Sequence, residues 1–263
     1  HGEKIEESTL KKGYKEGEEK RFVDEIVPIF KDLWSRLGIE YDRFIRTTDP
    51  EHKRCVQSAL DKLFKAGKIY KKAYKGWFCT PCETFWSETQ SPDGICPECK
   101  RPLEKLDEIN YFFKTSEYQT WLVEYINSHP DFVRPDFRKN EVLGFLKEPL
   151  NDLCISRPKS RLKWGIELPF DKDYVAYVWF DALVSYISAI GWPTDTEEFK
   201  KWWPVTQYAG KDNLRQQSAM WQAMLMSAGL APSKQIIIHG HITSEGRKMS
   251  KSLGNIISPI EHK

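Results

Sequence analysis

Residues 205–239 have the sequence VTQYAGKDNLRQQSAMWQAMLMSAGLAPSKQIIIH, in which two short strand-like runs flank a long helical pattern. Val205–Ala209 is predicted as a strand, and Gln235–His239, with three consecutive isoleucines, has the composition of a buried strand. Asp212–Ala228 has the length and pattern of a helix, and a glycine follows it. Strands that alternate with helices favour a parallel sheet with right-handed crossovers. This stretch therefore predicts an α/β fold.

Helical patterns also fill much of the first part of the chain. Apolar residues recur every three or four positions from Phe22 to Leu37, with Gly38 as a stop, and again from Val56 to Phe64 before Gly67. The further predicted elements are a strand and turn at Tyr41–Thr47, a strand at Ile69–Phe78, a turn at Ser91–Gly94, a helix around Glu117–Ser128 that Asp131–Phe137 interrupts, a strand at Val175–Phe180 and a helix from Asp181 to about Ile190.

The composition indicates a soluble globular protein. Of 263 residues, 40% are hydrophobic and 30% are charged, and the formal net charge of +2 gives no overall attraction to nucleic acid. No apolar run approaches the roughly 20 residues that span a bilayer, so we expect no membrane association. Six cysteines, four of them in close pairs, favour a reducing compartment, and we expect a cytoplasmic location. Cys55 and Cys154 stand outside the pairs and are interpreted as small core residues.

The paired cysteines predict a metal site. Cys79 with Cys82 and Cys96 with Cys99 form two Cys-x-x-Cys pairs that thirteen residues separate. A gap of two residues lets both sulfurs of a pair face one ion, and two pairs complete the tetrahedral thiolate shell of zinc. Because protein would fill all four positions, we predict a structural Zn²⁺. Two disulfides or four buried thiols are the alternative.

A lysine-rich loop, Lys248-Met249-Ser250-Lys251-Ser252, comes shortly after the last predicted strand. Gly246 and Gly254 on either side allow a mobile loop, which can close over a triphosphate and place ammonium groups where charge develops as pyrophosphate leaves. A solvated basic turn is the alternative from composition alone. The position favours the first interpretation, because ligands of α/β sheets bind at the carboxyl ends of the strands.

This loop, followed by Leu-Gly-Asn, resembles the second signature of the class I aminoacyl-tRNA synthetases. The resemblance extends over the whole chain and implies an α/β fold with an incomplete Rossmann-type nucleotide-binding parallel sheet and an inserted zinc-knuckle connective domain. The stretches that resemble the methionyl-tRNA synthetases in particular are Tyr177–Ala182, Gly210-Lys211-Asp212, Ile155-Ser156-Arg157, Asn110–Phe113, Phe44–Thr48, the insertion after Gly76-Trp77, and His1–Lys4.

The resemblance implies roles for the lysine loop and for the nucleotide site. Lys251 is expected to stabilise the adenylation transition state, with Lys248 assisting. Asp212 is expected to bind the ribose hydroxyls of ATP, although its position also predicts a helix N-cap. The residues that the resemblance assigns to ATP binding are Gly210, Asp212, His239, Gly240 and Lys251.

The resemblance also implies a methionine pocket. Helical spacing alone favours ordinary core packing for its aromatic residues over a ligand pocket. Many relatives carry a histidine where this chain has Gln217, and an aliphatic residue where it has Asn213. Glutamine can still donate a hydrogen bond, but both departures put the details of methionine recognition in doubt. The residues implied are Trp179, Ala182, Tyr186, Gln217 and Trp221, with Arg157 near the amino-acid head group.

The resemblance divides the chain into four segments. Residues 1–68 form a mainly helical part of the catalytic Rossmann-type domain, and 69–150 form a connective insertion with a zinc knuckle at about 69–113 and helices. Residues 151–245 form the second half of the catalytic domain, and 246–263 form the lysine loop and the start of a stem. The family's His-Ile-Gly-His signature is expected before residue 1 and its anticodon-binding domain after residue 263. We therefore expect a fragment that is inactive alone.

The function implied is a methionine–tRNA ligase, which activates methionine with ATP and Mg²⁺ and transfers it to tRNA(Met). One alternative is a class I synthetase for valine, isoleucine, leucine or cysteine, although a large editing domain does not fit into 263 residues. Another is a non-catalytic zinc-containing RNA-binding module, for which Lys71, Lys72, Lys75, Lys100 and Arg101 would supply a basic edge. The sequence gives no indication of oligomeric state.

Overall fold

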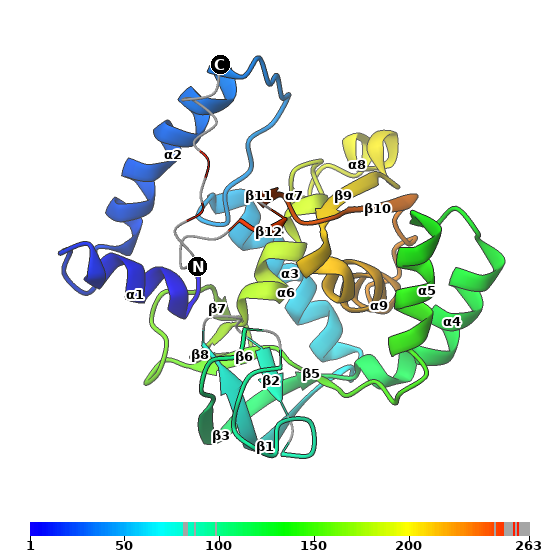
Figure 1. Ribbon diagram of the computed structural model, residues 1–263, viewed down its shortest axis with the longest axis horizontal. Helices are drawn as coiled ribbons and strands as arrows, with labels where there is room; N and C mark the ends of the chain where they lie inside the picture. The colour runs from blue at the N-terminus through cyan, green and yellow to red at the C-terminus, as the bar shows by residue number, and fades with distance from the viewer. Residues whose placement is uncertain are drawn as a thin grey trace. The chain divides into compact units, whose positions relative to one another are not determined.

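The chain forms two compact units in a computed structural model, which describes residues 1–80, 84–86, 88–97, 99–244, 246–249, 255 and 257 (Figure 1). The first unit comprises His1–Pro28, Tyr41–Lys114 and Asn151–Lys201. The second comprises Ile29–Glu40, Thr115–Leu150 and Trp202–Lys263. Among the described residues, no helix is long and apolar enough to cross a membrane.

A parallel sheet organises the second unit. Its order is β4 (Val133–Arg134), β10 (Gln235–His239) and β9 (Thr206–Gly210), and both neighbours of β10 run parallel to it. The predicted strands at Gln235–His239 and Val205–Ala209 are confirmed, the second shifted by one residue. Alternate residues of β10 are buried, with Ile236 and Ile238 almost inaccessible, because both join the core of this unit.

Two helices complete that core. The short turn η1 (Thr115–Tyr118) leads into α4 (Gln119–Ser128), which confirms the predicted helix. The segment expected only to interrupt it instead forms β4 and the start of α5 (Asp136–Phe145). The buried residues of this core are Leu122, Ile126, Phe132, Val133, Val142, Leu146, Ala209, Leu214, Ala219, Ile236 and Ile238.

The helical stretch between β9 and β10 is not uniform. It begins as η2 (Lys211–Asn213), passes through a π-helical turn, η3 (Gln216–Met220), and continues as α9 (Trp221–Ser227). A π turn replaces the ordinary i→i−4 hydrogen bonds with i→i−5 bonds. The Ser218 hydroxyl donates to Leu214 O at 2.6 Å, and the Gln222 amide donates to Gln217 O at 2.9 Å. The predicted helix is confirmed, but it contains an irregular turn with added side-chain hydrogen bonds.

The first unit is built around an antiparallel ribbon. Strands β1 (Ile69–Cys79) and β3 (Glu104–Phe113) pair over ten residues, and β2 (Thr84–Trp86) and β5 (Leu153–Cys154) flank them in the order β2-β1-β3-β5. The strand predicted at Ile69–Phe78 is confirmed. The predicted turn is also confirmed, because Gly94 N donates to Ser91 O at 3.1 Å.

A second small sheet corrects one strand prediction. Its order is β6 (Ser156–Pro158), β8 (Asp171–Ala176) and β7 (Glu167–Leu168), and every pairing is antiparallel. The predicted strand at Val175–Phe180 is wrong beyond Ala176, where the chain turns into α6 (Val178–Leu183) and α7 (Ser185–Ser188). A short apolar run suits a buried helix face as well as a strand, so its composition did not separate the two.

The remaining helices among the described residues lie outside these sheets in the sequence. They are α1 (Glu3–Lys11), which was not predicted, α2 (Glu19–Arg36), α3 (Pro50–Lys65) and α8 (Thr196–Trp202). The prediction of α3 is confirmed, and Val56, Leu60 and Leu63 are buried as its pattern requires.

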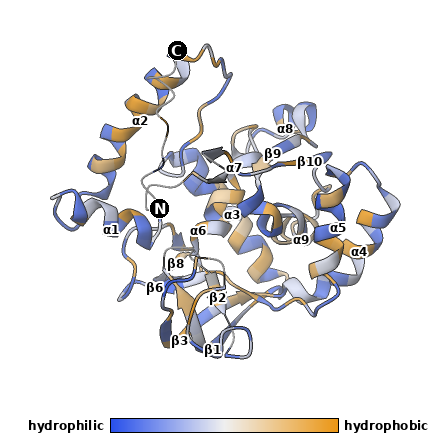
Figure 2. Cartoon of the chain, viewed as in Figure 1, coloured by the Kyte–Doolittle hydropathy of each residue, from blue (hydrophilic) through white to orange (hydrophobic). Residues whose placement is uncertain are grey.

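Helix α2 forms as predicted and ends before Gly38, whose φ of 69° suits glycine. Its apolar stripe (Figure 2) is less buried than the pattern indicated, because Phe22 is buried whereas Phe30 is 50% exposed. The strand predicted at Tyr41–Thr47 is wrong, because that segment is neither helix nor strand.

The last described element is a hairpin in the second unit. Strands β11 (Thr243–Ser244) and β12 (Arg247–Lys248) pair antiparallel. Gly246, with a φ of 73°, makes the turn between them.

Candidate functional site

The carboxyl ends of β9 and β10 form one edge of the parallel sheet, and two predicted ATP residues end these strands. His239 pairs in register with Gly210, and the imidazole ring lies over that glycine. A Cβ on Gly210 would stand 3.6 Å from His239 Cε1, so a larger side chain would crowd the ring. Gly240 follows, and a Cβ on it would meet none of the described atoms within 4 Å, so this position leaves room beside the sheet edge.

Asp212 lies at the same edge, directly after β9. Gly210 rather than Asp212 precedes the first helical residue, so the predicted N-cap role is wrong and Asp212 belongs to the first turn. Its side chain is 62% exposed, and its Oδ1 lies 3.5 Å from His241 Nε2. An accessible carboxylate beside a helix start and the end of a parallel sheet can accept hydrogen bonds from a ligand's hydroxyl groups.

The lysine loop is only partly described. Lys248 lies in β12, where its backbone pairs with Thr243, and Met249 N donates to Ile242 O at 3.1 Å. Ser250 to Gly254, and hence Lys251, lie outside the described residues. The predicted roles of both lysines stay predictions.

Three of the predicted methionine residues lie on α6 and α7 of the first unit. Trp179, Ala182 and Tyr186 are each partly exposed, whereas Phe180 and Leu183 between them are buried. Positions separated by three and four residues share one face of a helical stretch. That face is therefore not fully used in packing within the first unit.

Gln217 and Trp221 belong to the second unit and are nearly inaccessible there, at 3% and 1% exposure. Gln217 lies in the π turn and Trp221 begins α9. The Trp221 ring meets Trp203 edge-on with 6.3 Å between ring centroids, and the Trp203 indole N–H donates to Ala231 O. Both residues are buried in the chain, and their contact with methionine stays a prediction.

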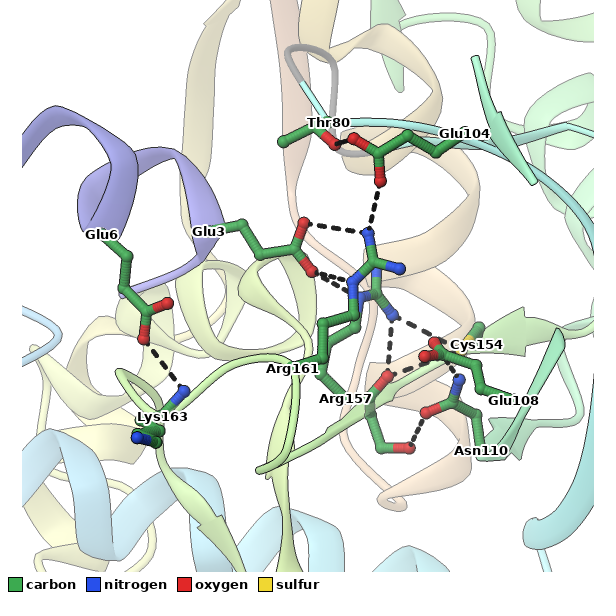
Figure 3. Close-up of polar contacts among 11 residues, drawn as sticks. Glu3, Glu6, Thr80, Glu104, Glu108, Asn110, Cys154, Arg157, Arg161 and Lys163 are labelled. Atoms are coloured by element: carbon green, nitrogen blue, oxygen red, sulfur yellow. Dashed lines mark hydrogen bonds and ion pairs between the residues drawn. The ribbon is translucent and has the colours of Figure 1, made fainter. Parts of the chain in front are cut away.

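Arg157 lies in an aromatic cage in the first unit, and Figure 3 shows its polar surroundings. It is 2% exposed, and its guanidinium carbon lies 4.8 Å from the ring centroid of Phe78, 4.4 Å from that of Phe85 and 4.7 Å from that of Tyr177. These distances are within the range of cation–π attraction. Its Nη1 also donates to Ser156 O at 2.7 Å.

Glu3 of α1 joins this arginine to a second one. Its Oε1 lies 3.7 Å from Arg157 Nε and accepts a hydrogen bond from Arg161 Nε at 2.6 Å. Arg161 also contacts Glu104 of β3 at 3.2 Å. We name Glu3, Arg157 and Arg161 the arginine clasp, which connects α1 to the ribbon. Sequence reasoning missed Glu3 and Arg161, because partners 158 residues apart leave no local pattern.

A carboxylate next to the arginine clasp is perturbed. Glu6 accepts the backbone N–H groups of Trp164 at 2.6 Å and Lys163 at 2.9 Å. Burial raises the pKa of Glu6 and outweighs these two hydrogen bonds, which lower it; the nearby charges of Glu19 and Glu3 raise it further. Glu6 thus holds its proton to a higher pH than an exposed glutamate does.

The described members of the cysteine pairs lie together. The sulfurs of Cys79, Cys96 and Cys99 all lie within 4.8 Å of one another, and Cys79 Sγ is 3.5 Å from Cys99 Sγ. A tetrahedral ion with zinc–sulfur bonds of about 2.3 Å would space its sulfurs by about 3.8 Å, so the three thiols suit such an ion. Cys82 lies outside the described residues.

The backbone around these thiols also holds a compact turn. Lys100, directly after Cys99, has a φ of 60°, and its N–H donates to Cys96 O at 2.9 Å. Cys55 and Cys154, interpreted as core residues, are both buried as expected. None of the five described cysteines forms a disulfide.

Comparison with known proteins gives a consistent result. The sequence pattern of the family described as tRNA synthetases class I (M) matches residues 1–110 and 103–263. The methionine–tRNA ligases of Clostridium acetobutylicum and Caldanaerobacter subterraneus are 50% and 48% identical over 99% of this chain. The chain spans about 40% of the length of each.

The fold matches solved structures too. The crystal structure of Mycobacterium tuberculosis methionyl-tRNA synthetase bound by methionyl-adenylate superposes with a TM-score of 0.92 at 36% identity. The match covers 99% of this chain and 52% of that one. The chain therefore belongs to the methionyl-tRNA synthetases of class I.

Proposed function

We propose that the full-length protein containing this chain is a methionine–tRNA ligase. It would activate methionine with ATP to methionyl-adenylate and then transfer the methionyl group to tRNA(Met). The observation that carries this proposal is 50% identity to a methionine–tRNA ligase over nearly the whole chain. The superposition on a synthetase bound by methionyl-adenylate supports the same reaction.

We assign ATP binding to the exposed edge of the parallel sheet. Asp212 would accept the ribose hydroxyls, and Gly210, His239 and Gly240 would lie beside the adenine. In the reaction, a methionine carboxylate oxygen attacks the α-phosphorus of ATP, and pyrophosphate, with Mg²⁺, leaves. Lys251, assisted by Lys248, would stabilise the charge that develops on the phosphate oxygens.

We assign methionine binding to the residues that the family resemblance implies. The partly exposed face of Trp179, Ala182 and Tyr186 supports the proposal, because aromatic and aliphatic surface suits a polarisable thioether. Gln217 and Trp221 would complete the pocket. Arg157 would bind the methionine head group, which requires that its guanidinium act outside the aromatic cage.

We propose a structural zinc ion on Cys79, Cys82, Cys96 and Cys99. The three described sulfurs support it by their spacing, and Cys79 and Cys96 are inaccessible to solvent. The metal would hold a small module whose core contains Trp86 and Leu103. Elemental analysis of protein purified without chelator should give one zinc per chain, and a value well below one would contradict the proposal.

We further propose the domain order of the family for this chain. Residues 1–68 and 151–245 would form the two halves of a Rossmann-type catalytic domain, with 69–150 as the connective insertion and 246–263 as the lysine loop and the start of the stem. The two Cys-x-x-Cys pairs favour a reducing compartment, and we propose a cytoplasmic location.

ATP–pyrophosphate exchange on the full-length protein tests the function. Exchange should depend on methionine, and valine, isoleucine, leucine and cysteine should support little. Lys251→Ala should slow exchange by about 10²–10³-fold, the scale of losing one preorganised electrostatic group. Lys234→Ala, an exposed lysine of the same unit, serves as the control and should keep the wild-type rate. Exchange with another amino acid but not methionine would overturn the assignment.

A further inference from the structure

A buried polar network joins three segments of the first unit. Asp181 of α6 is 1% exposed, and its two carboxylate oxygens each meet a histidine. Oδ1 lies 2.6 Å from His52 Nε2, and Oδ2 lies 2.5 Å from His1 Nδ1. His52 on α3 is inaccessible to solvent, and its Nδ1 lies 2.8 Å from Ser188 Oγ on α7. We name these four residues the Asp181 bridge.

The carboxylate of Asp181 determines the direction of the two hydrogen bonds that it makes. A carboxylate only accepts, so His52 Nε2–H and His1 Nδ1–H both donate to Asp181. His52 Nδ1 also lies within hydrogen-bond distance of Ser188 Oγ, whose hydroxyl is within 3.4 Å of Ser185 O as well. Both carboxylate oxygens are thereby bonded, as a buried charge requires. Removing His52 would leave Oδ1 of a buried charge without its donor, which is a costly change.

The Asp181 bridge lies directly behind the proposed methionine face. Asp181 stands between Trp179 and Ala182 on α6, but it is buried whereas they are partly exposed. Helices α6 and α7 have only six and four residues, too few to be stable by themselves. Their orientation therefore depends on the contacts that their buried side chains make with the rest of the first unit. His52 supplies that hold for both, because it bonds Asp181 on α6 and Ser188 on α7.

The histidine that completes the network is itself packed. The His1 side chain is 2% exposed, and its ring meets Trp164 edge-on at 5.0 Å between centroids. The network thus spans from the start of α1 through α6 to α3. All four of its residues belong to the first unit, whereas the proposed ATP residues belong to the second.

We infer that His52 and Asp181 are positioning residues for methionine binding: they hold α6 and α7 so that Trp179, Ala182 and Tyr186 form one wall of the pocket. This inference rests on the proposed function. His52 and Asp181 are assigned to methionine binding and not to ATP binding, because the proposed ATP residues lie on or next to β9, η2 and β10 and not on α6 or α7. Loss of the network should therefore raise the KM for methionine and leave the KM for ATP nearly unchanged.

The test compares variants of the full-length protein by ATP–pyrophosphate exchange. His52→Leu should raise the KM for methionine by about 10–100-fold, the scale of a misplacement of about 1 Å in a binding group. His52→Gln keeps an amide donor near the position of Nε2 and should restore the KM to within a few-fold of wild type. Cys55→Ala is the matched control, since Cys55 is buried on the same helix and lies outside the network.

Amide hydrogen exchange over residues 178–188 gives a readout independent of the substrate. His52→Leu should speed exchange there by at least tenfold, and Cys55→Ala should change it less. If His52→Leu does not fold, Asp181→Asn, which keeps the shape and loses one acceptor, is read by the same two measurements. Unchanged exchange at 178–188, equal KM effects for both substrates, or failure of His52→Gln to restore the KM would each overturn the inference. A wild type inactive with methionine overturns the proposed function instead, and amide exchange still tests the bridge.

Discussion

Replacing Arg157 with methionine separates two roles for this residue. The family resemblance predicts contact with the amino-acid head group, whereas the structure places the guanidinium among three rings and beside Glu3. Methionine is uncharged and close to arginine in volume, so it keeps part of the apolar packing and removes the polar and cation–π contacts.

The expected loss follows from the contacts. One desolvated guanidinium on aromatic faces contributes up to about 2 kcal/mol, and its charged hydrogen bond to Ser156 O contributes about 1.5–3 kcal/mol. Glu3 keeps its 2.6 Å hydrogen bond to Arg161, so no isolated buried charge remains. Apolar contact by methionine offsets part of the loss. We therefore expect local opening to become easier by about 3 kcal/mol, or about 100-fold in rate of amide exchange.

Hydrogen–deuterium exchange of the full-length protein measures this directly. Peptides that cover α1 and the Cys79 end of β1 should exchange about two orders of magnitude faster in Arg157→Met. Arg138→Met is the control, since Arg138 is a buried arginine of the second unit and pairs with Glu141. Unchanged exchange in those peptides together with a raised KM for methionine would refute a structural clasp and show that the guanidinium serves the substrate.

Two further predictions concern titratable groups. Burial raises the pKa of the Cys55 and Cys154 thiols, so in native protein a thiol reagent should modify neither, even after a chelator exposes the zinc-site cysteines; modification before denaturant is added would contradict their burial. The pKa of Glu6 is raised in the folded state, so wild-type stability falls as the pH rises from the ordinary glutamate pKa through the folded-state value. Glu6→Gln has no carboxyl to ionise, so its stability should not fall in this way, and its melting temperature relative to that of the wild type should rise between pH 4 and pH 7. A difference in melting temperature that stays constant with pH would contradict the raised pKa of Glu6.

The parallel sheet was predictable because its evidence is local. The isoleucine run of β10 and the helical pattern before it lie next to each other in the chain, and the strands pair as neighbours. The cysteine spacing was equally informative, because two-residue gaps bring sulfurs together whatever surrounds them. Asp212 follows a strand as predicted, but its position in the helix was wrong by two residues, because Gly210 is the residue that precedes the first helical residue.

The rest depended on distant partners. Val178 starts a helix in place of the predicted strand, and the buried Asp181 of that helix contacts His52, which is 129 residues away. The exposure of Phe30 on α2 could not be predicted either, because the periodicity shows that a helix face is apolar but does not show whether another element covers it. Arg157 looked like a ligand-binding residue in sequence, and only the fold revealed the rings and the glutamate around it.

Because of the π turn before Trp221, the deletion of one residue can change the geometry of this helix during evolution. Gln216–Met220 hold one more residue than a regular α turn would need. A deletion of a single codon there would let the helix close regularly and rotate Gln217 by about 100° relative to Trp221. Lineages of this family can thus reshape this helix by losing a residue instead of exchanging one. Gene surveys that record only substitutions would overlook such a change.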